Sequence, residues 1–325
     1  MSEKLRWGII STARINRRLI PAIRTANRSR LVGLAGRDPA HSRNYAARWE
    51  IGRVWDSYQA LLESDEVDAV YLPLPNSLHS EWVLRALAAG KHVLCEKPLA
   101  LHAAEVREME AAAREADLVL MEAMAYRLHP QYLRLRELVL EGELGRLRLI
   151  RAHYAFTLPE DSGNIRLDPA LGGGCLYDIG VYPLSFALGL DPSRVEEATA
   201  TFRSSVGGVD TICCGRLLFA SGVLAQFDVS FRMPYRVGAE VIGEEGRLIV
   251  PNPWQPDLDG KPSGLIRVLP DDREEIISTE KVDPYLAEVR AMEEAVLDFE
   301  PAGYPLKESR RVAGVIDRLK GAAGG

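Results

Sequence analysis

Short apolar runs alternate with helix-like segments over the first part of the chain. In the last of these segments, Val106, Met109, Ala113 and Ala116 recur three or four positions apart and form one face of a helix. Strands that alternate with helices imply right-handed βαβ units and a parallel sheet. We therefore predict a doubly wound α/β domain over residues 1–125. The apolar runs are Trp7–Ile10, Leu31–Ala35, Ala69–Leu72, His92–Leu94 and Leu118–Met121, and the helical segments are 14–25, 39–49, 57–63, 77–89 and 102–116.

The pattern changes after residue 125, where strands dominate. Val223, Ala225, Phe227, Val229 and Phe231 alternate with Leu224, Gln226, Asp228 and Ser230, which is typical of a strand with one buried face. We therefore predict an α+β domain over 126–325 with a large, mostly antiparallel open sheet. Further strands are expected near 146–157, 195–203, 210–219, 237–243, 247–250, 264–269 and 275–279, and helices at 130–141, after Asp283-Pro284 and at 306–320.

Composition narrows the class of protein. The chain has 325 residues, 47% of them hydrophobic and 26% charged, so two domains are the natural expectation. Its net charge of −6 argues against a nucleic-acid-binding surface. No apolar run approaches the roughly 18 residues of a membrane span, and the N-terminus has no signal-peptide pattern. The cysteines show no spacing typical of a metal site or a disulfide framework, so we expect a reducing, cytoplasmic setting.

The first strand-to-helix turn follows Trp7-Gly8-Ile9-Ile10. A dinucleotide-binding fold usually carries G-x-G-x-x-G here, and this chain places Ser11, Ala13 and Asn16 at those three positions. Small side chains still let the backbone approach a pyrophosphate, which the N-terminus of the helix attracts. The residues expected to contact the cofactor in this turn are Ser11, Thr12, Ala13, Arg14 and Ile15.

The second strand ends at Ala35-Gly36-Arg37-Asp38. An acidic residue here binds the ribose 2′-hydroxyl of NAD, whereas an arginine suits the 2′-phosphate of NADP. Arg37 therefore favours NADP over NAD, with Arg14 as a second cation. Two simpler interpretations stay open: Arg37 is a solvated loop residue, and Asp38 caps the helix that begins at Pro39.

Two further stretches leave the sheet at its carboxyl edge. At the first of them, we expect Leu72 to contact the cofactor and Asn76 or His79 to face it, although Asn76 equally well caps the next helix. The segment containing Tyr126 and Arg127 crosses to the second domain, and we expect Arg127 to contact the cofactor as well. Together with residues 154–166 and Phe231–Arg236, Tyr126 and Arg127 are expected to form the walls of the substrate pocket.

The stretch Leu94–Ala100 places a charged pair, Glu96-Lys97, before a proline at the exit of a buried strand. Pro98 biases Lys97 away from helix, and the bond between them is one that can be cis. An ammonium group at this edge lies where open α/β folds bind ligands. Lys97 is therefore a candidate catalytic residue, and Glu96 either orients it or caps local backbone. Both Glu96 and Lys97 are also expected to contact the cofactor. The alternative is a plain solvated turn.

The stretch Gly172–Leu184 is the second unusual passage. Its three consecutive glycines imply close backbone approach or strong bending, and a helix is expected from Leu176 onward. Asp178 and Tyr182 would then lie at i, i+4 on one face. A carboxylate orients a phenol, and a lysine lowers the pKa of a phenol toward working pH, which together suit a general acid. The alternative is a hydrogen bond on a helix surface.

Taken together, these passages resemble the glucose–fructose oxidoreductase, inositol dehydrogenase and MocA family. The motifs that carry the resemblance are Trp7–Ala13, Pro75–His79, Cys95–Pro98, Gly172–Gly174 and Asp178–Pro183. Within the family, the chain is most similar to the branch with dimeric dihydrodiol dehydrogenase and xylose dehydrogenases, in which a tyrosine follows the aspartate by four residues.

The resemblance implies an enzyme: an NAD(P)-dependent dehydrogenase or reductase for a sugar, polyol or related compound. Lys97, Asp178 and Tyr182 would be its catalytic residues, and the second domain's open sheet would form a homodimer or homotetramer. No metal is implied. Two other functions stay open: a non-catalytic nucleotide sensor of the same fold, and an NAD-dependent glycosidase.

Overall fold

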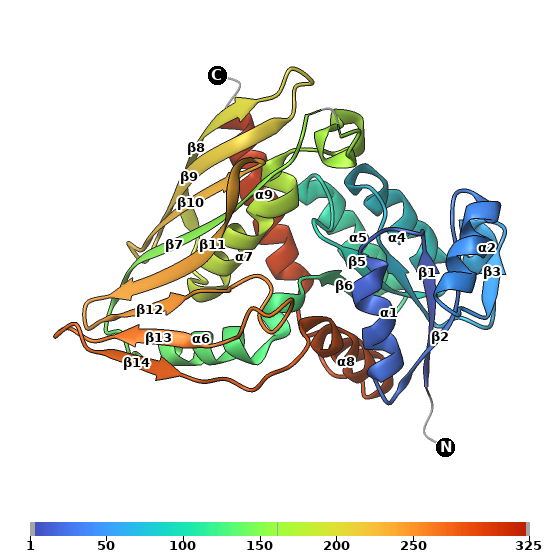
Figure 1. The fold of residues 1–325 in the computed structure, drawn as a ribbon, viewed down its shortest axis with the longest axis horizontal. Helices are drawn as coiled ribbons and strands as arrows, with labels where there is room; N and C mark the ends of the chain where they lie inside the picture. Colours follow the sequence, from blue (N-terminus) through green and yellow to red (C-terminus); the bar gives the residue numbers. More distant parts are fainter. Residues whose placement is uncertain (1–3, 161, 323–325) are drawn as a thin grey trace. The chain divides into compact units, whose positions relative to one another are not determined.

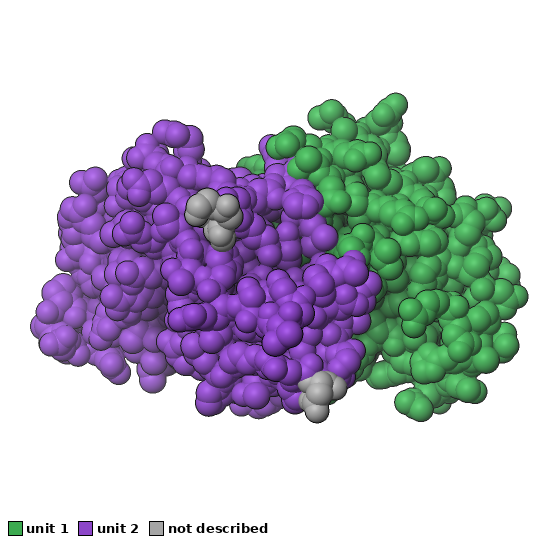
Figure 2. Space-filling view, turned by 90° about the horizontal axis from the view of Figure 1, so that it is seen from above, with its two compact units in different colours: residues 1–100, 104–125, 285–307 green, residues 101–103, 126–284, 308–325 purple. Residues whose placement is uncertain are grey.

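The computed structural model describes residues 4–160 and 162–322. The chain divides into two compact units, coloured separately in Figure 2. Unit 1 contains the described residues up to Ala100, together with Ala104–Ala125 and Tyr285–Lys307. Unit 2 contains Leu101–Ala103, Tyr126–Pro284 and the described residues from Glu308 onward.

Unit 1 is built on a parallel six-stranded sheet of order β3-β2-β1-β4-β5-β6 (Figure 1). This order is that of the doubly wound dinucleotide-binding fold, so the predicted fold class is confirmed. The short edge strand β3 was not predicted, because none of the apolar runs in the sequence covers it. The strands are β1 (Leu5–Ile10), β2 (Ser29–Ala35), β3 (Arg53–Trp55), β4 (Ala69–Leu72), β5 (His92–Glu96) and β6 (Leu120–Ala123). The helices between them are α1 (Asn16–Thr25), α2 (Pro39–Arg48), α3 (Tyr58–Leu62), α4 (His79–Ala88) and α5 (Ala103–Glu115).

Helix α8 (Pro284–Leu297) packs with unit 1, although the predicted boundary at residue 125 places it in the second domain. Its apolar residues Val289 and Met292 are fully buried. Glu293 accepts a hydrogen bond from the backbone N–H of Arg28 at 3.1 Å, and Asp298 pairs with the Arg28 guanidinium at 2.9 Å. The prediction that α8 belongs to a second domain of 126–325 is therefore wrong. These contacts join distant parts of the sequence that no local pattern connects.

Unit 2 is built on an eight-stranded sheet of order β14-β13-β12-β11-β7-β10-β9-β8, in which β10 and β7 are the parallel neighbours (Figure 1). The predicted mostly antiparallel sheet is thus confirmed. Helix α7 (Val181–Leu190) packs on β7 and β10, on one face of the sheet. The strands are β7 (Leu147–Thr157), β8 (Val195–Ser204), β9 (Asp210–Phe219), β10 (Leu224–Ser230), β11 (Arg232–Gly243), β12 (Arg247–Val250), β13 (Leu265–Val268) and β14 (Glu274–Ile277).

The remaining helices complete unit 2 and follow the expected segments closely. They are α6 (Pro130–Leu140), α7 (Val181–Leu190) and α9 (Leu306–Ala322), of which the last begins at the edge of unit 1. Helix α6 has Pro130 in its first turn and His129 as its cap, whose ring nitrogen accepts from Gln131 N–H at 3.0 Å. Over the described ranges, we find no helix with the length and apolar character that crossing a membrane demands.

Candidate active site

The turn after β1 lies at the point where the strand order of unit 1 reverses, which is where such sheets bind dinucleotides. Ser11 has a φ of 117°, a backbone region that favours glycine, so the turn keeps its tight shape without the usual residue. The Ser11 hydroxyl donates to the carbonyl of Pro73 at 3.0 Å and accepts from Ala13 N–H at 3.2 Å. Asn16 donates to the carbonyl of Ser11 at 3.0 Å. These bonds tie the ends of β1 and β4 together and hold the turn.

The cofactor-binding features of unit 1 fit a dinucleotide with a 2′-phosphate. Arg14 and Arg37 are both exposed, while Thr12, Ala13 and Ile15 are half-buried beside the start of α1. A Cβ at Gly36 would lie 2.2 Å from the Ser42 hydroxyl, so this position accepts only glycine without rearrangement. The chain therefore retains a compact turn, a helix N-terminus and exposed cations at the place where a pyrophosphate and a ribose phosphate bind.

Asp38 is the N-cap of α2. Its carboxylate accepts from Ala40 N–H at 2.8 Å and from His41 N–H at 3.2 Å. The hydrogen bonds from His41 and then Ala40 lower the pKa of this carboxyl. The alternative interpretation of Asp38 as a helix cap is thus confirmed, and Arg37 is left as the exposed side chain at the tip of β2.

The segment that carries Lys97 is anchored on both sides of the lysine. The buried Tyr71 hydroxyl donates to Glu96 at 2.6 Å, and Glu96 also accepts from Lys97 N–H at 3.3 Å. Beyond the lysine, Leu99 N–H donates to the buried carboxylate of Glu122 at 2.9 Å. The Lys97–Pro98 peptide bond is cis. Lys97 is therefore held at the carboxyl end of β5 by side chains from β4 and β6, and Glu96 orients this backbone.

His79 belongs to the same scaffold. Its ring is fully buried, with Nδ1 2.8 Å from the Pro98 carbonyl and Nε2 2.9 Å from the Leu74 carbonyl. Burial lowers the pKa of this imidazole. The expectation that His79 faces the cofactor is therefore wrong, because both ring nitrogens face backbone carbonyls of unit 1. Leu72 is buried as the last residue of β4, and its contact with the cofactor stays a prediction.

Asn76 begins a short 3₁₀ turn, Asn76–Leu78, that leads into α4 and is half-buried. The cap position of α4 is Leu78, so the alternative interpretation of Asn76 as the cap of this helix is wrong. The expected contact between the Asn76 side chain and the cofactor remains a proposal.

In unit 2, the three glycines start the helical segment that bears Asp178 and Tyr182. Gly172 has a φ of 74° and Gly174 a φ of 123°, both in the left-handed region. A Cβ at Gly173 would lie 2.7 Å from the carbonyl oxygens of Arg166 and Asp168. The prediction of close backbone approach and bending is therefore confirmed.

The helix predicted from Leu176 onward opens with a wide π-helical turn, Leu176–Gly180, before α7 continues it. Regular i, i+4 geometry between Asp178 and Tyr182 is therefore interrupted, because π turns form i→i+5 hydrogen bonds. The turn is held by buried Asp210, which accepts from Leu176 N–H at 2.7 Å and from Lys320 at 3.0 Å. A π turn inside an α-helix is frequent at functional sites.

Asp178 is nearly buried and pairs with an arginine. Arg166 Nε donates to Asp178 Oδ2 at 2.6 Å, and this carboxylate raises the pKa of the guanidinium. Tyr182 is half-buried in an aromatic cluster, with its ring centroid 5.6 Å from that of Tyr154 and 5.7 Å from that of Trp254. Unit 2 thus gathers a carboxylate, a guanidinium and several phenols around the start of α7.

Arg127 lies inside unit 2. Its guanidinium donates to the Ser185 carbonyl at 2.6 Å and stacks 4.5 Å from the centre of the Tyr132 ring. Its neighbour Tyr126 is fully buried and bonds to Ser185 at 2.6 Å. These contacts hold the guanidinium beside α7, and the expected contact of Arg127 with the cofactor stays a prediction.

Sequence reasoning missed Asp210 and Trp254, and it included Arg166 only within the range 154–166 that was expected to form the wall of the substrate pocket. Arg166 follows Asn164, whose side chain caps a short turn, but nothing in the sequence pairs it with Asp178. Trp254 lies in the long loop after β12 and donates to the His153 carbonyl at 3.0 Å. The sequence offered one signal for Asp210: it is an acidic residue at the start of a strand. The fold places this residue against the glycine run.

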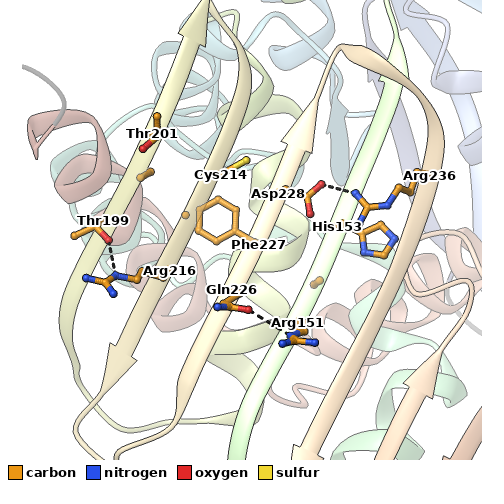
Figure 3. Close-up of a pocket in the computed structure, with 13 residues that line it drawn as sticks. Arg151, His153, Thr199, Thr201, Cys214, Arg216, Gln226, Phe227, Asp228 and Arg236 are labelled. Carbon is orange, nitrogen blue, oxygen red and sulfur yellow. Dashed lines mark hydrogen bonds and ion pairs between the residues drawn. The ribbon is translucent and has the colours of Figure 1, made fainter.

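The exposed face of the unit 2 sheet carries a shallow hollow of about 560 Å³ (Figure 3). Its polar side chains are tied to one another, as in the pairs Arg236–Asp228 at 2.6 Å and Arg151–Gln226 at 3.3 Å. Asp178 and Tyr182 are not among its lining residues. The hollow is therefore a feature of the open sheet, separate from the aromatic cluster.

Comparison with known proteins identifies the family. A model described as an oxidoreductase family with an NAD-binding Rossmann fold matches residues 5–124, and the GFO/IDH/MocA C-terminal domain matches residues 132–249. The chain is 37% identical to D-xylose 1-dehydrogenase (NADP(+)) 2 of Haloferax volcanii, over 96% of this chain and 95% of that protein. It is 34% identical to trans-1,2-dihydrobenzene-1,2-diol dehydrogenase of Sus scrofa, over 78% of this chain and 76% of that protein.

A solved structure agrees with these sequence matches. The 3-ketoreductase from Actinomadura kijaniata, in complex with NADP and TDP-benzene, matches with a TM-score of 0.89 at 32% identity, over 98% of each chain. The two dehydrogenases above are of the branch that the motifs resemble. The chain belongs to the glucose–fructose oxidoreductase, inositol dehydrogenase and MocA family of NAD-binding oxidoreductases.

Proposed function

We propose that this protein is an NADP-preferring dehydrogenase or reductase acting on a hydroxyl or carbonyl group of a sugar, polyol or related compound. The observation that carries the proposal is the full-length similarity to an NADP-dependent xylose dehydrogenase. The NADP-bound 3-ketoreductase supports the same cofactor, and the dihydrodiol dehydrogenase supports a substrate range that extends beyond sugars.

In this proposal Lys97, Asp178 and Tyr182 act on the reacting oxygen. Tyr182 donates a proton to the oxygen during reduction and accepts it during oxidation. Lys97 hydrogen-bonds the same oxygen and favours the phenolate form of Tyr182, because a nearby positive charge stabilises a phenolate. Asp178 positions these groups. The anchoring of the Lys97 segment by Tyr71, and of the helical segment by Asp210, supports these roles because preorganised groups need no rearrangement at the moment of reaction.

The cofactor supplies or accepts the hydride when it is bound. Residues Ser11, Thr12, Ala13, Arg14 and Ile15 would hold its pyrophosphate, and Arg37 would bind the 2′-phosphate. Glu96 ends β5, and Asn76 begins the short turn that follows β4; both would line its nicotinamide end. Exposed cations and the tight turn at Ser11 support this assignment.

A panel of aldoses, polyols, dihydrodiols and keto sugars, assayed with NADP(H) and NAD(H) side by side, tests the function. We expect net cofactor reduction or oxidation with at least one class, and faster turnover with the phosphorylated cofactor. Nucleotide binding without turnover across the whole panel would instead identify a sensor. Release of an aglycone without net cofactor reduction would identify a glycosidase.

We further propose a homodimer or homotetramer formed through the exposed face of the unit 2 sheet, and a reducing cytoplasmic location. The polar hollow on that face and the free thiols of Cys95, Cys175, Cys213 and Cys214 support these two points. Sedimentation should give an oligomer for the parent and a smaller species for Thr201→Arg, which adds charge and bulk at the hollow. A parent that sediments as a monomer would contradict the assembly.

A further inference from the structure

Arg166, which forms an ion pair with Asp178 in unit 2, has no role in the proposed mechanism. Arg166 Nε lies 2.6 Å from Asp178 Oδ2, and the Asp178 side chain is only 12% exposed. A carboxylate so shielded from water stays ionised only with a strong partner. Without the guanidinium, the nearby phenols would face an uncompensated negative charge.

The backbone of Arg166 is fixed on both sides, unlike that of an ordinary surface arginine. Its N–H donates to the Asn164 side chain at 3.0 Å, and its carbonyl accepts from Gly174 N–H at 2.9 Å. Only a residue without a Cβ fits at Gly173, directly against the Arg166 carbonyl. The glycine run that starts the helical segment of Asp178 and Tyr182 therefore also places this arginine.

Several charged or titratable groups surround Tyr182 within unit 2. Arg166 interacts electrostatically with both Tyr182 and Tyr154, and Asp178 interacts with Tyr154. From β11, Tyr235 interacts with Tyr154 and carries the ammonium group of Lys261 4.5 Å from its ring centre. Tyr126 packs its ring 5.9 Å from Tyr182. Arg166 is thus a positive charge that acts on the carboxylate and on both phenols.

We propose that Arg166 is a positioning residue of the reaction: it holds Asp178 ionised and oriented, and its charge keeps Tyr182 able to exchange its proton at working pH. The role of Tyr182 rests on the proposed function, whereas the charge balance rests on the geometry of unit 2. Loss of the guanidinium leaves the Asp178 charge to oppose formation of a phenolate.

A titration of residue 182 tests the charge balance without requiring turnover. We would place 3-fluorotyrosine at position 182 and follow its fluorine resonance against pH in the full-length protein. Arg166→Met should raise the midpoint by about one pH unit, as expected for loss of a nearby positive charge that interacts with the phenol. Arg166→Lys should give a smaller rise, because lysine keeps the charge but not the planar geometry.

The matched control is Arg148→Met. It removes an exposed arginine of β7 that pairs with Glu244, and it should leave the midpoint unchanged. Should Arg166→Met fail to fold, Arg166→Lys carries the test with a rise in the same direction. Equal midpoints in the parent and in every folded Arg166 variant would overturn the inference.

Kinetics separate this inference from the proposed function. With unmodified Tyr182, the acidic limb of the kcat/KM profile for oxidation should move to higher pH in Arg166→Met, and Arg166→Lys should restore part of the loss. A shifted titration midpoint in a protein that turns over no substrate would refute the proposed function and leave the charge balance standing. Normal turnover with an unshifted kinetic profile would refute the positioning role alone.

Discussion

Arg37 is the exposed side chain on which the preference for NADP rests. Arg37→Ala should weaken NADP binding roughly tenfold or more and leave NAD binding nearly unchanged, because a charge-assisted bond to a phosphate contributes about 1.5–3 kcal/mol. Titration of protein fluorescence with each nucleotide measures both affinities. Arg85→Ala, which removes an exposed arginine paired with Glu81 on α4, is the control. Equal losses for the two nucleotides would show that Arg37 does not select the phosphate.

At the level of single residues, the sequence predicts which residues belong to the site better than it predicts the groups that they contact. Lys97 and Asp178 stand out because a charged residue beside a proline or a glycine run is unusual, and both lie at anchored positions. His79 shows the limit: its type suits cofactor binding, but its ring contacts the backbone carbonyl of Leu74, five residues earlier, and that of Pro98 in the loop after the next strand. Such pairing depends on the tertiary fold, which a linear pattern does not contain.

At the scale of elements, the glycine run controls where the helical segment of Asp178 and Tyr182 begins. Gly173→Ala should lower stability by about 1–3 kcal/mol, because the new methyl group overlaps backbone oxygens that cannot move aside. It should also reduce turnover, since those oxygens belong to the turn that carries Arg166. Chemical denaturation and steady-state kinetics measure the two effects. Gly52→Ala, with no atom near its Cβ position, should be neutral in both, and a neutral Gly173→Ala would contradict the packing argument.

The elements themselves were largely predictable, because periodicity reflects burial directly. The π turn at Leu176–Gly180 was not, since its extra width comes from tertiary anchoring by Asp210 and Lys320. The short strand β3 was also beyond the pattern, since three residues at a sheet edge carry too few apolar positions to form a run.

At the scale of the whole molecule, buried and half-buried histidines make stability depend on pH. Burial lowers the pKa of His79, His92, His129 and His153. In the unfolded chain these groups take up protons below about pH 6.5, before the folded protein does. Stability from this source is therefore fully present above about pH 6.5 and declines as the pH falls toward the folded pKa values.

The melting temperature should accordingly fall between neutral and mildly acidic pH. His79→Gln should lower it at every pH but make its decline shallower, because one of the groups that takes up a proton is gone. Calorimetric scans across this range measure the slope, with the exposed His41→Gln as control. An unchanged slope in His79→Gln would mean that this ring is already protonated in the folded protein.

The division of the molecule was predictable only in part. The change from alternating helices and strands to a strand-rich pattern marks a boundary in the sequence, but the return of α8 to unit 1 does not show in it. That return depends on Arg28, Glu293 and Asp298, which are charged residues without a periodic signal.

We propose that Tyr182 exchanges the proton of the reaction and that Lys97 supplies the positive charge beside it. Turnover of two single variants tests these roles. With the best substrate of the panel, Tyr182→Phe and Lys97→Ala should each lower kcat by roughly 10²–10⁴-fold, the usual contribution of general acid–base catalysis. The affinity of the Tyr182→Phe variant for NADP should stay close to that of the parent. Turnover within a few-fold of the parent in either variant would contradict the account.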